Sequence, residues 1–301
     1  MPIQTASLED IQRRFVAHTP QMADIGLTVT ATSAGRAAMR LPDRPDWLGD
    51  PARALLHPGP LIVLADSCCG LAVGTALTQR QPIATLDLRM DYLRRAGPGH
   101  DLHCETQCYR MTPNVAFVRG DIWQSARDQP VATVQAAFML ATPARRQAVP
   151  SGPLPLDAAA WEAPPADAPV LGGVEIPYAS YLGIRQSDDG ATPLYRLPFQ
   201  PKLVGNPQLP ALHGGVVAGF AESAATLHLI HAIGGAKFPK CIDFSIDYLR
   251  SGRPEDTYAS CEIVRLGARV ALVQVRCWQS KGPEQPITVA RGNFLLTEAN
   301  P

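Results

Sequence analysis

The hydrophobic residues of this chain follow a helical spacing in one segment and a strand-like spacing in the next. In the apolar stretch LIVLADSCCGLAV, they recur every three or four positions, at Leu61, Leu64, Cys68 and Leu71, and the same spacing continues to Thr75 just after it. Directly afterwards the period becomes two, with Leu86, Leu88, Met90 and Tyr92 alternating with Asp87, Arg89 and Asp91. The pattern predicts a long helix followed by a half-buried strand.

The same order returns about 156 residues later. The second helical spacing is carried by Val217, Phe220, Ala224 and Leu227. The strand pattern that follows it places Ile242, Phe244, Ile246 and Tyr248 in alternation with Asp243, Ser245 and Asp247. The tripeptide Tyr-Leu-Arg ends both strands, at 92–94 and at 248–250. A period of this length predicts two copies of a whole domain.

Each copy has further elements in a common order. Ser7-Leu-Glu-Asp10 has the pattern of a capping box and predicts a short helix, for which IPYASYL at 176–182 is the expected counterpart. One or two strands precede the long helix and end at the matching segments MRLP (39–42) and YRLP (195–198). Three more strand-like runs follow in each copy. The expected fold class is therefore α+β, with a long helix wrapped by an antiparallel sheet in each copy.

A segment rich in proline and alanine separates the two copies. Residues 150–169 read PSGPLPLDAAAWEAPPADAP, which is typical of an extended connector. We therefore expect an N-terminal domain at 1–146, a linker at 147–169 and a C-terminal domain at 170–298.

Composition excludes several classes of partner. The chain has 301 residues, of which 46% are hydrophobic, enough for two cores. Lysine plus arginine equals aspartate plus glutamate at 27 each, so nucleic acid is not an expected partner. The start of the chain carries acids and no signal-like apolar run, and no stretch approaches the apolar length of a membrane span, so no membrane is expected either. The seven cysteines lack a zinc-type pairing, which indicates reduced thiols in the cytoplasm and neither a metal nor a cofactor.

A histidine motif opens each long helix. In the second copy Asn206 precedes Leu212-His213-Gly214-Gly215, and Glu222 follows eight residues after Gly214. In the first copy the same positions hold Asp50, then Leu56-His57-Pro58-Gly59, then Asp66. The N–H groups and the dipole at a helix N-terminus stabilise negative charge on a carbonyl oxygen under attack. A carboxylate on the other side of the carbonyl carbon can activate water or attack directly.

This combination resembles the hotdog fold and, within it, the PaaI-like acyl-CoA thioesterases. Their pattern runs from an asparagine through Leu-His-Gly-Gly to an aspartate or glutamate, and then to a strand that ends in Tyr-Leu-Arg. The resemblance covers nearly the whole chain, twice. It implies a double hotdog that hydrolyses acyl-CoA at sites shared between two hotdog units.

Helix geometry determines which carboxylate serves which helix start. Gly214 and Glu222 are eight residues apart on one helix, about 12 Å of rise, so one reacting carbonyl cannot contact both. The acid that serves Gly214 must come from the other copy, on a helix that runs the opposite way. Two composite sites follow, which combine His213, Gly214 and Asn206 with Asp66, and His57, Pro58 and Asp50 with Glu222.

The two composite sites are not expected to be equally active. Proline has no backbone N–H, so Pro58 removes the donor that Gly214 supplies. Asp50 places a carboxylate where the family has an amide, and its negative charge is expected to repel the developing oxyanion. We therefore expect hydrolysis only at the Gly214–Asp66 site. Ser67, Gly215, Arg94 and Arg250 are the expected substrate-binding residues, with the two arginines placed to meet phosphates of coenzyme A. Two alternatives stay open. Ser67 could form its hydrogen bond within its own helix, and the two arginines could be solvated residues at strand ends.

Two rival functions stay open. One is a hotdog hydratase or dehydratase that acts on acyl-CoA, although the expected motifs of that family are not found here. The other is a protein that binds acyl-CoA without turnover. A homodimer of double-hotdog chains is the expected assembly, because its four hotdog units would match the tetramers of the resembled family.

Overall fold

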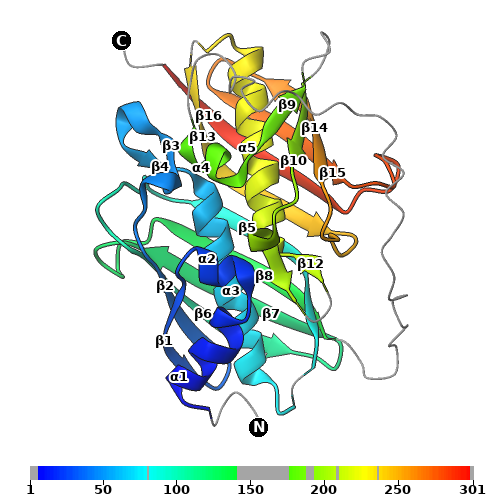
Figure 1. Ribbon diagram of the computed structural model, residues 1–301. Helices are drawn as coiled ribbons and strands as arrows, with labels where there is room; N and C mark the ends of the chain where they lie inside the picture. Colours follow the sequence, from blue (N-terminus) through cyan, green and yellow to red (C-terminus); the bar gives the residue numbers. More distant parts are fainter. Residues whose placement is uncertain are drawn as a thin grey trace.

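The computed structural model describes residues 6–79, 81–140, 176–187, 193–207, 210–235 and 237–298. The expected linker at 147–169 and the domain ends beside it lie outside these ranges. Within them the chain forms two similar units, each a long helix against an antiparallel sheet, which is the hotdog fold repeated in tandem (Figure 1).

The first unit begins with short helical segments and then builds most of its sheet after the long helix. Its elements are α1 (Leu8–Ile11), the π-helix η2 (Gln12–Ala17), α2 (Pro20–Asp24), β1 (Thr28–Ser33), β2 (Arg36–Leu41), η3 (Pro45–Trp47), β3 (Leu48–Asp50), η4 (Pro51–Arg53), β4 (Leu55–Leu56), α3 (Pro58–Ala76), β5 (Ile83–Tyr92), β6 (Leu102–Met111), β7 (Val115–Trp123) and β8 (Ala132–Leu140).

The second unit repeats this order. Its elements are α4 (Pro177–Leu182), β9 (Arg185–Ser187), β10 (Leu194–Leu197), η6 (Pro201–Leu203), β11 (Val204–Asn206), β12 (Ala211–Leu212), α5 (Gly214–Ala232), β13 (Lys237–Tyr248), β14 (Thr257–Leu266), β15 (Val270–Trp278) and β16 (Thr288–Glu298).

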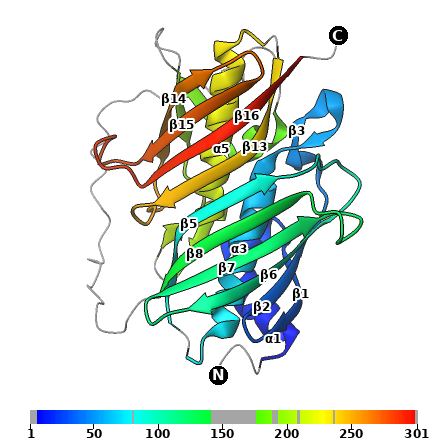
Figure 2. The same ribbon diagram turned by 180° about the vertical axis from the view of Figure 1, so that it is seen from behind.

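The two sheets join edge to edge into one sheet of 12 described strands. Its order is β1-β2-β6-β7-β8-β5-β13-β16-β15-β14-β10-β9, and Figure 2 shows β5 and β13 side by side at its centre. These two strands are antiparallel, with Arg89 opposite Ser245. Arg89 forms ion pairs with Asp91 at 2.6 Å and with Asp243 at 3.7 Å. Pairing the two central strands removes the exposed edge that each unit alone would present.

Both long helices lie on one face of this sheet and pack against each other in opposite directions (Figures 1 and 2). Glycines permit the close approach. A Cβ atom on Gly215 would lie 2.6 Å from the Cα of Val63, and one on Gly219 would lie 3.4 Å from the Cα of Gly59. The predicted antiparallel helix pair is therefore confirmed.

Helix α3 is more apolar than expected from the sequence. By length and composition alone it is a candidate membrane span, so the expectation that no stretch reaches that length is wrong. However, 89% of its apolar window is buried within the protein, between the sheet and α5. The run of apolar residues is explained by burial on all sides.

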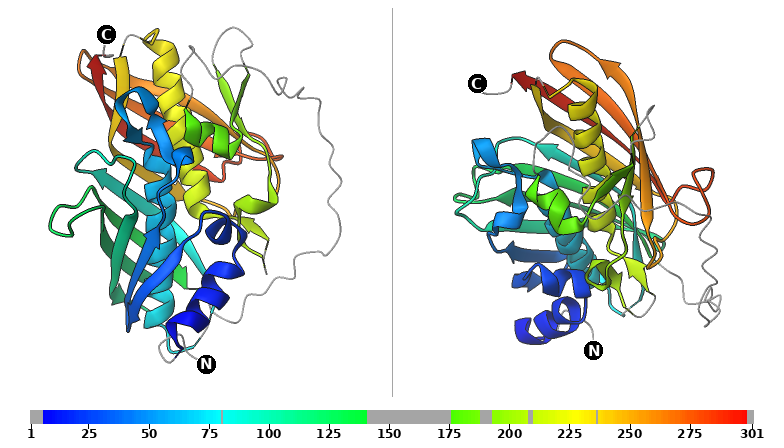
Figure 3. Two further views of the ribbon diagram at one scale, coloured as in Figure 1. Left: turned by 60° about the vertical axis from the view of Figure 1, so that its left-hand side comes forward. Right: turned by 45° about the horizontal axis from the view of Figure 1, so that its top comes forward.

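Each unit places a short helix against the other unit's helix-entry segment. Helix α4 contacts η3 and β3, while α2 contacts η6 and β11. Figure 3 shows these short helices on the side of α3 and α5 away from the sheet. The counterpart of α4 is α2, not the capped helix at Ser7, because both begin with proline and end before a left-handed glycine, Gly26 (φ 71°) or Gly183 (φ 72°). The expected correspondence with the Ser7 helix was wrong, although Ser7 does cap α1.

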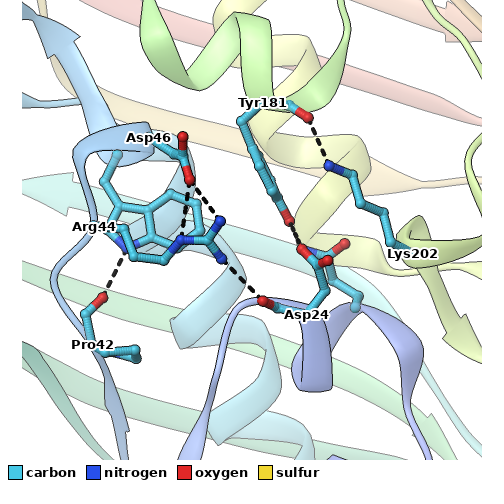
Figure 4. Close-up of polar contacts among 8 residues, drawn as sticks. Asp24, Pro42, Arg44, Asp46, Tyr181 and Lys202 are labelled. Atoms are coloured by element: carbon cyan, nitrogen blue, oxygen red, sulfur yellow. Dashed lines mark hydrogen bonds and ion pairs between the residues drawn. The ribbon is translucent and has the colours of Figure 1, made fainter.

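Polar contacts between α2, η3, α4 and η6 hold the two units together on the helix side (Figure 4). The Tyr181 hydroxyl donates to Asp24 at 2.7 Å, and Arg44 donates to the Asp24 carbonyl at 3.0 Å. Lys202 donates to the Tyr181 carbonyl at 3.0 Å, and its ammonium lies 3.9 Å from the centre of the Tyr181 ring. The loops that lead into both long helices are thereby fixed relative to each other.

Candidate active site

The structure brings together the residues of both predicted composite sites. Site A combines the start of α5, at His213, Gly214 and Gly215, with Asp66 of α3. Site B combines the start of α3, at His57, Pro58 and Gly59, with the region around Glu222 of α5.

In site A both oxygens of the Asp66 carboxylate accept hydrogen bonds. Gly215 N–H donates to Oδ2 at 2.8 Å, and the Thr85 hydroxyl donates to Oδ1 at 2.9 Å. A Cβ atom on Gly214 would lie 2.9 Å from Oδ2, so a larger residue there would displace the carboxylate. Among the described residues no hydrogen bond occupies the Gly214 N–H. Site A therefore presents a fixed carboxylate beside an available backbone donor at a helix N-terminus.

His213 orients the start of α5. Its Nδ1 accepts the Gly215 N–H at 3.1 Å, which assigns the ring proton to Nε2, and Nε2 lies 3.1 Å from the Ser67 hydroxyl. Burial lowers the pKa of His213, and the nearby Asp66 only partly opposes that shift. The imidazole is thus neutral, and its role is to position the helix entry. Ser67 also donates to the Val63 carbonyl at 2.7 Å, so the predicted substrate contacts Ser67 and Gly215 both have partners inside the protein.

Site B holds its carboxyl group differently. Glu222 is fully buried, and its Oε2 accepts the Tyr92 hydroxyl at 3.1 Å. Oε1 has no partner within the described part of the chain. Burial raises the pKa of Glu222 to about 8, against the lowering effect of hydrogen bonds with Cys241 and Tyr92. At neutral pH Glu222 is therefore mainly protonated, which leaves only a minor fraction of the carboxylate form.

The helix start of site B is also altered. His57 repeats the interaction of His213, since its Nδ1 accepts the Gly59 N–H at 2.9 Å, and burial lowers its pKa to about 3. Pro58 offers no N–H in the position of Gly214. The Tyr178 ring stacks on His57 with centroids 4.8 Å apart, and a Cβ atom on Gly59 would lie 2.0 Å from this ring. Site B is therefore packed more tightly on its α4 side.

The loop positions Asp50 and Asn206 lie at corresponding places, at the ends of β3 and β11. The Asp50 carboxylate is buried and accepts bonds from Arg53, at 3.2 Å from the backbone N and 2.9 Å from the guanidinium. The expected repulsion between Asp50 and an oxyanion is therefore reduced, because Arg53 offsets its charge. Asn206 pairs with Ala211, two residues before His213, and remains partly accessible.

A pocket of about 760 Å³, open mouth included, adjoins site B. It is lined by both units and includes His57, Pro58, Tyr92 and Cys241. Arg94, one of the predicted substrate contacts, lines this pocket rather than site A. Arg250, the other, donates to the Pro286 carbonyl at 2.6 Å.

Several site residues were not identified from the sequence. Thr85 donates to Asp66, and its counterpart 156 residues later, Cys241, lowers the pKa of the nearby Glu222 while its thiol donates to the Asp243 carbonyl at 3.4 Å. Both are turned inward by an irregular register, between Thr85 and Asp87 in β5 and between Cys241 and Asp243 in β13. The sequence pattern identifies Tyr92 and Tyr248 only as matching strand ends. In the structure, the Tyr248 hydroxyl donates to the Gly214 carbonyl at 2.8 Å. The signal that the sequence offered for Thr85 and Cys241 is that one repeat position holds threonine in the first copy and cysteine in the second.

Comparisons with known proteins agree with this architecture. The sequence model of the Thioesterase superfamily matches residues 54–131 and again residues 209–285. The medium/long-chain acyl-CoA thioesterase YigI of Escherichia coli is 26% identical over 147 residues, covering 44% of this chain and 94% of that protein.

Two solved structures share the tandem fold. The tesB protein of Mycobacterium avium subspecies paratuberculosis has a TM-score of 0.58 at 14% identity, covering 96% of this chain and 99% of that one. A hot dog fold protein of unknown function from Alicyclobacillus acidocaldarius has a TM-score of 0.62 at 10% identity, covering 91% and 97%. At these identities the likeness shows the fold alone.

Proposed function

The chain belongs to the thioesterase superfamily, and we propose that it hydrolyses acyl-CoA thioesters to a free acid and coenzyme A at site A. The observation that carries the proposal is the Asp66 carboxylate, held 2.8 Å from the Gly215 nitrogen beside the unoccupied Gly214 N–H. Two units that contribute opposite halves of one site explain why both copies are needed.

The chemistry divides between the two helices. The thioester carbonyl oxygen accepts the Gly214 N–H, where the α5 dipole stabilises the negative charge that develops on it. Asp66 takes a proton from water as the water oxygen bonds to the carbonyl carbon. The carbon–sulfur bond then breaks, and the thiolate takes up the proton. Direct attack by Asp66 would instead form a mixed anhydride that water hydrolyses to the same products.

The proposed roles of the surrounding residues follow from their contacts. Thr85 holds Asp66 in one orientation, while His213 fixes the first turn of α5. Asn206 is the candidate to contact the acyl group or the attacking water from the loop before α5. Arg250 is the candidate phosphate contact of this site.

We propose one productive site per chain. Site B has no N–H donor at position 58, because that residue is proline, and its Glu222 is mainly protonated at neutral pH. Loss of one oxyanion donor typically costs about 3–4 kcal/mol in transition-state stabilisation.

A cytoplasmic location fits the seven cysteines, all of them free thiols. A homodimer of these chains is the proposed assembly.

The test is a thiol-release assay with a series of acyl-CoA substrates. Because YigI is named for medium and long chains, these chain lengths are the first to assay, followed by short and aryl acyl groups. Release of coenzyme A with the free acid supports the proposal. Hydration of an enoyl-CoA without thiol release would identify the rival hydratase, and binding without any turnover would identify the non-catalytic alternative.

A further inference from the structure

The pocket beside site B is built by both units. The first unit contributes its β3–β4 loop and the start of α3, together with the segment that follows Tyr92; the second contributes Thr226 and residues 239–241. Tyr92, which donates to Glu222, and Cys241 form part of its wall. Glu222 itself is fully buried, and its Oε1 lacks a partner among the described residues.

The side chains that line this pocket carry an excess of positive charge. Four cationic side chains line it, namely Arg53, Arg94, Arg95 and Lys240. Its one lining carboxylate, Asp50, is already bonded by Arg53 at 2.9 Å. At the corresponding repeat positions the sequence holds Leu209, Arg250, Ser251 and Ala84, which is one cation instead of four. At these four positions, the site without the oxyanion donor therefore has more positive charge.

Clustered arginine and lysine side chains bind multiply charged phosphate groups, with arginine supplying paired donors. The pocket wall also includes apolar residues, among them Leu55, Leu61 and Pro58. Such a wall suits a narrow uncharged arm attached to the anion. The absent N–H at Pro58 means that a carbonyl in this arm finds no oxyanion donor there.

We propose that the site B pocket is a second ligand site, which binds a phosphate-bearing anion with an apolar arm and holds it without hydrolysis. The proposal rests on the proposed function, since it assumes that turnover takes place at site A. Its ligand is defined by chemistry, and two sources share that chemistry: the coenzyme A portion of substrate or product, and a free phosphate compound.

The experiment measures ligand binding by isothermal titration in the Asp66→Asn background, in which the proposed base of site A is absent. The probes are coenzyme A, pyrophosphate and decanoate. The double variant R95S/K240A introduces the residues found at the corresponding positions around site A. The charge-matched control is R265S/R269S, two exposed arginines outside the pocket. Loss of two charge-assisted contacts should raise the Kd of one bound equivalent of coenzyme A at least about tenfold, with no such change in the control.

Each outcome decides the proposal. Coenzyme A binding that weakens only in R95S/K240A supports it, and parallel behaviour of pyrophosphate would show that the phosphates alone suffice. Equal Kd values in both double variants would overturn it, as would binding of decanoate with no binding of coenzyme A. Thiol release is measured separately in chains that retain Asp66. If R95S/K240A abolished hydrolysis while Asp66→Asn alone did not, site B would be catalytic, and the proposed function would fail independently of the binding result.

Discussion

Sites A and B are two versions of one backbone arrangement that differ at a few side chains. In both, a histidine before the helix accepts the N–H two residues later, from Gly215 at 3.1 Å and from Gly59 at 2.9 Å. In both, a tyrosine at a strand end reaches the site, Tyr248 in A and Tyr92 in B. Site A then has aspartate, threonine and glycine where site B has glutamate, cysteine and proline.

These exchanges change the contacts of the carboxyl group rather than its location. Asp66 accepts a backbone N–H and a hydroxyl. Glu222 accepts the Tyr92 hydroxyl on one oxygen, its other oxygen has no partner among the described residues, and burial raises its pKa to about 8. The difference teaches that the fold alone does not determine whether such a site is catalytic. In the proposed assignment, the donors around each carboxyl group and the N–H at the helix start make the difference.

The largest difference between the sites is expected from removing the site A carboxylate. Asp66→Asn should reduce kcat by roughly 10²-fold or more, because an amide can neither accept the proton nor attack the carbonyl. The measurement is steady-state thiol release, and Glu222→Gln is the matched variant in site B. Equal losses in the two variants, or a greater loss in Glu222→Gln, would show that the active half is assigned wrongly.

The second prediction makes site A resemble site B at the helix start. Gly214→Pro should lower kcat by roughly 10²- to 10³-fold through loss of the oxyanion donor. Since any Cβ at this position lies 2.9 Å from Asp66 Oδ2, Gly214→Ala is the control that adds the Cβ atom but keeps the N–H. The proline variant should be clearly less active than the alanine variant. A folded Gly214→Pro protein with substantial activity would mean that site B is competent.

The third prediction concerns the hydroxyl that only site A possesses. Thr85→Val removes the 2.9 Å hydrogen bond to Asp66, and hydrogen bonds to charged groups contribute about 1.5–3 kcal/mol. We therefore expect kcat to fall roughly tenfold, with KM little changed, and Thr85→Ser to restore most of the activity. Cys241→Val is the site B control. A serine variant as slow as the valine variant would indicate a packing role for Thr85 instead.

The smallest effect on turnover is expected from Glu222→Gln. This variant should instead change how the free energy of unfolding depends on pH. In the folded protein Glu222 keeps its proton up to about pH 8, whereas its ordinary pKa is 4.5. The unfolded chain releases that proton first, so stability present below pH 4.5 is lost as pH rises towards 8, at up to about 1.4 kcal/mol per pH unit. Glutamine removes this dependence.

Urea unfolding at pH 5 and pH 8 measures that difference. The stability advantage of Glu222→Gln over the wild type should be small at pH 5 and larger at pH 8. A constant difference between the two proteins at both pH values would contradict the raised pKa.

The repeat made much of the fold predictable, because two copies of one pattern identify each other. The helix pair, the central strands and the partnership of Asp66 with the start of α5 all follow from period and helix rise. What the alternation could not predict was the irregularity near the start of each central strand. Leu86 and Ile242 were expected to face inward, but Ile242 is 38% exposed, and Thr85 and Cys241 turn inward instead.

Contacts made across the two units were also beyond the sequence pattern. Tyr178 packs onto His57 from a helix in the other unit, and the charge around the site B pocket depends on loops that meet only in the folded chain. Periodicity reports which face of an element is buried, not which side chain lies opposite. The Asp50–Arg53 pair is a local case, in which a charge expected to repel is already neutralised by a neighbour.

The pairing of Arg89 with Ser245 at the centre of the sheet has a consequence for how this protein evolves. In a dimer of identical subunits, a residue on the two-fold axis faces its own copy, so an arginine there would meet an arginine. Here one arginine faces a serine and bonds Asp91 and Asp243. Covalent fusion has thus released each position from being inherited in duplicate. A substitution now acts once, in one half, so the symmetry between the halves can be broken one residue at a time while the other half stays unchanged.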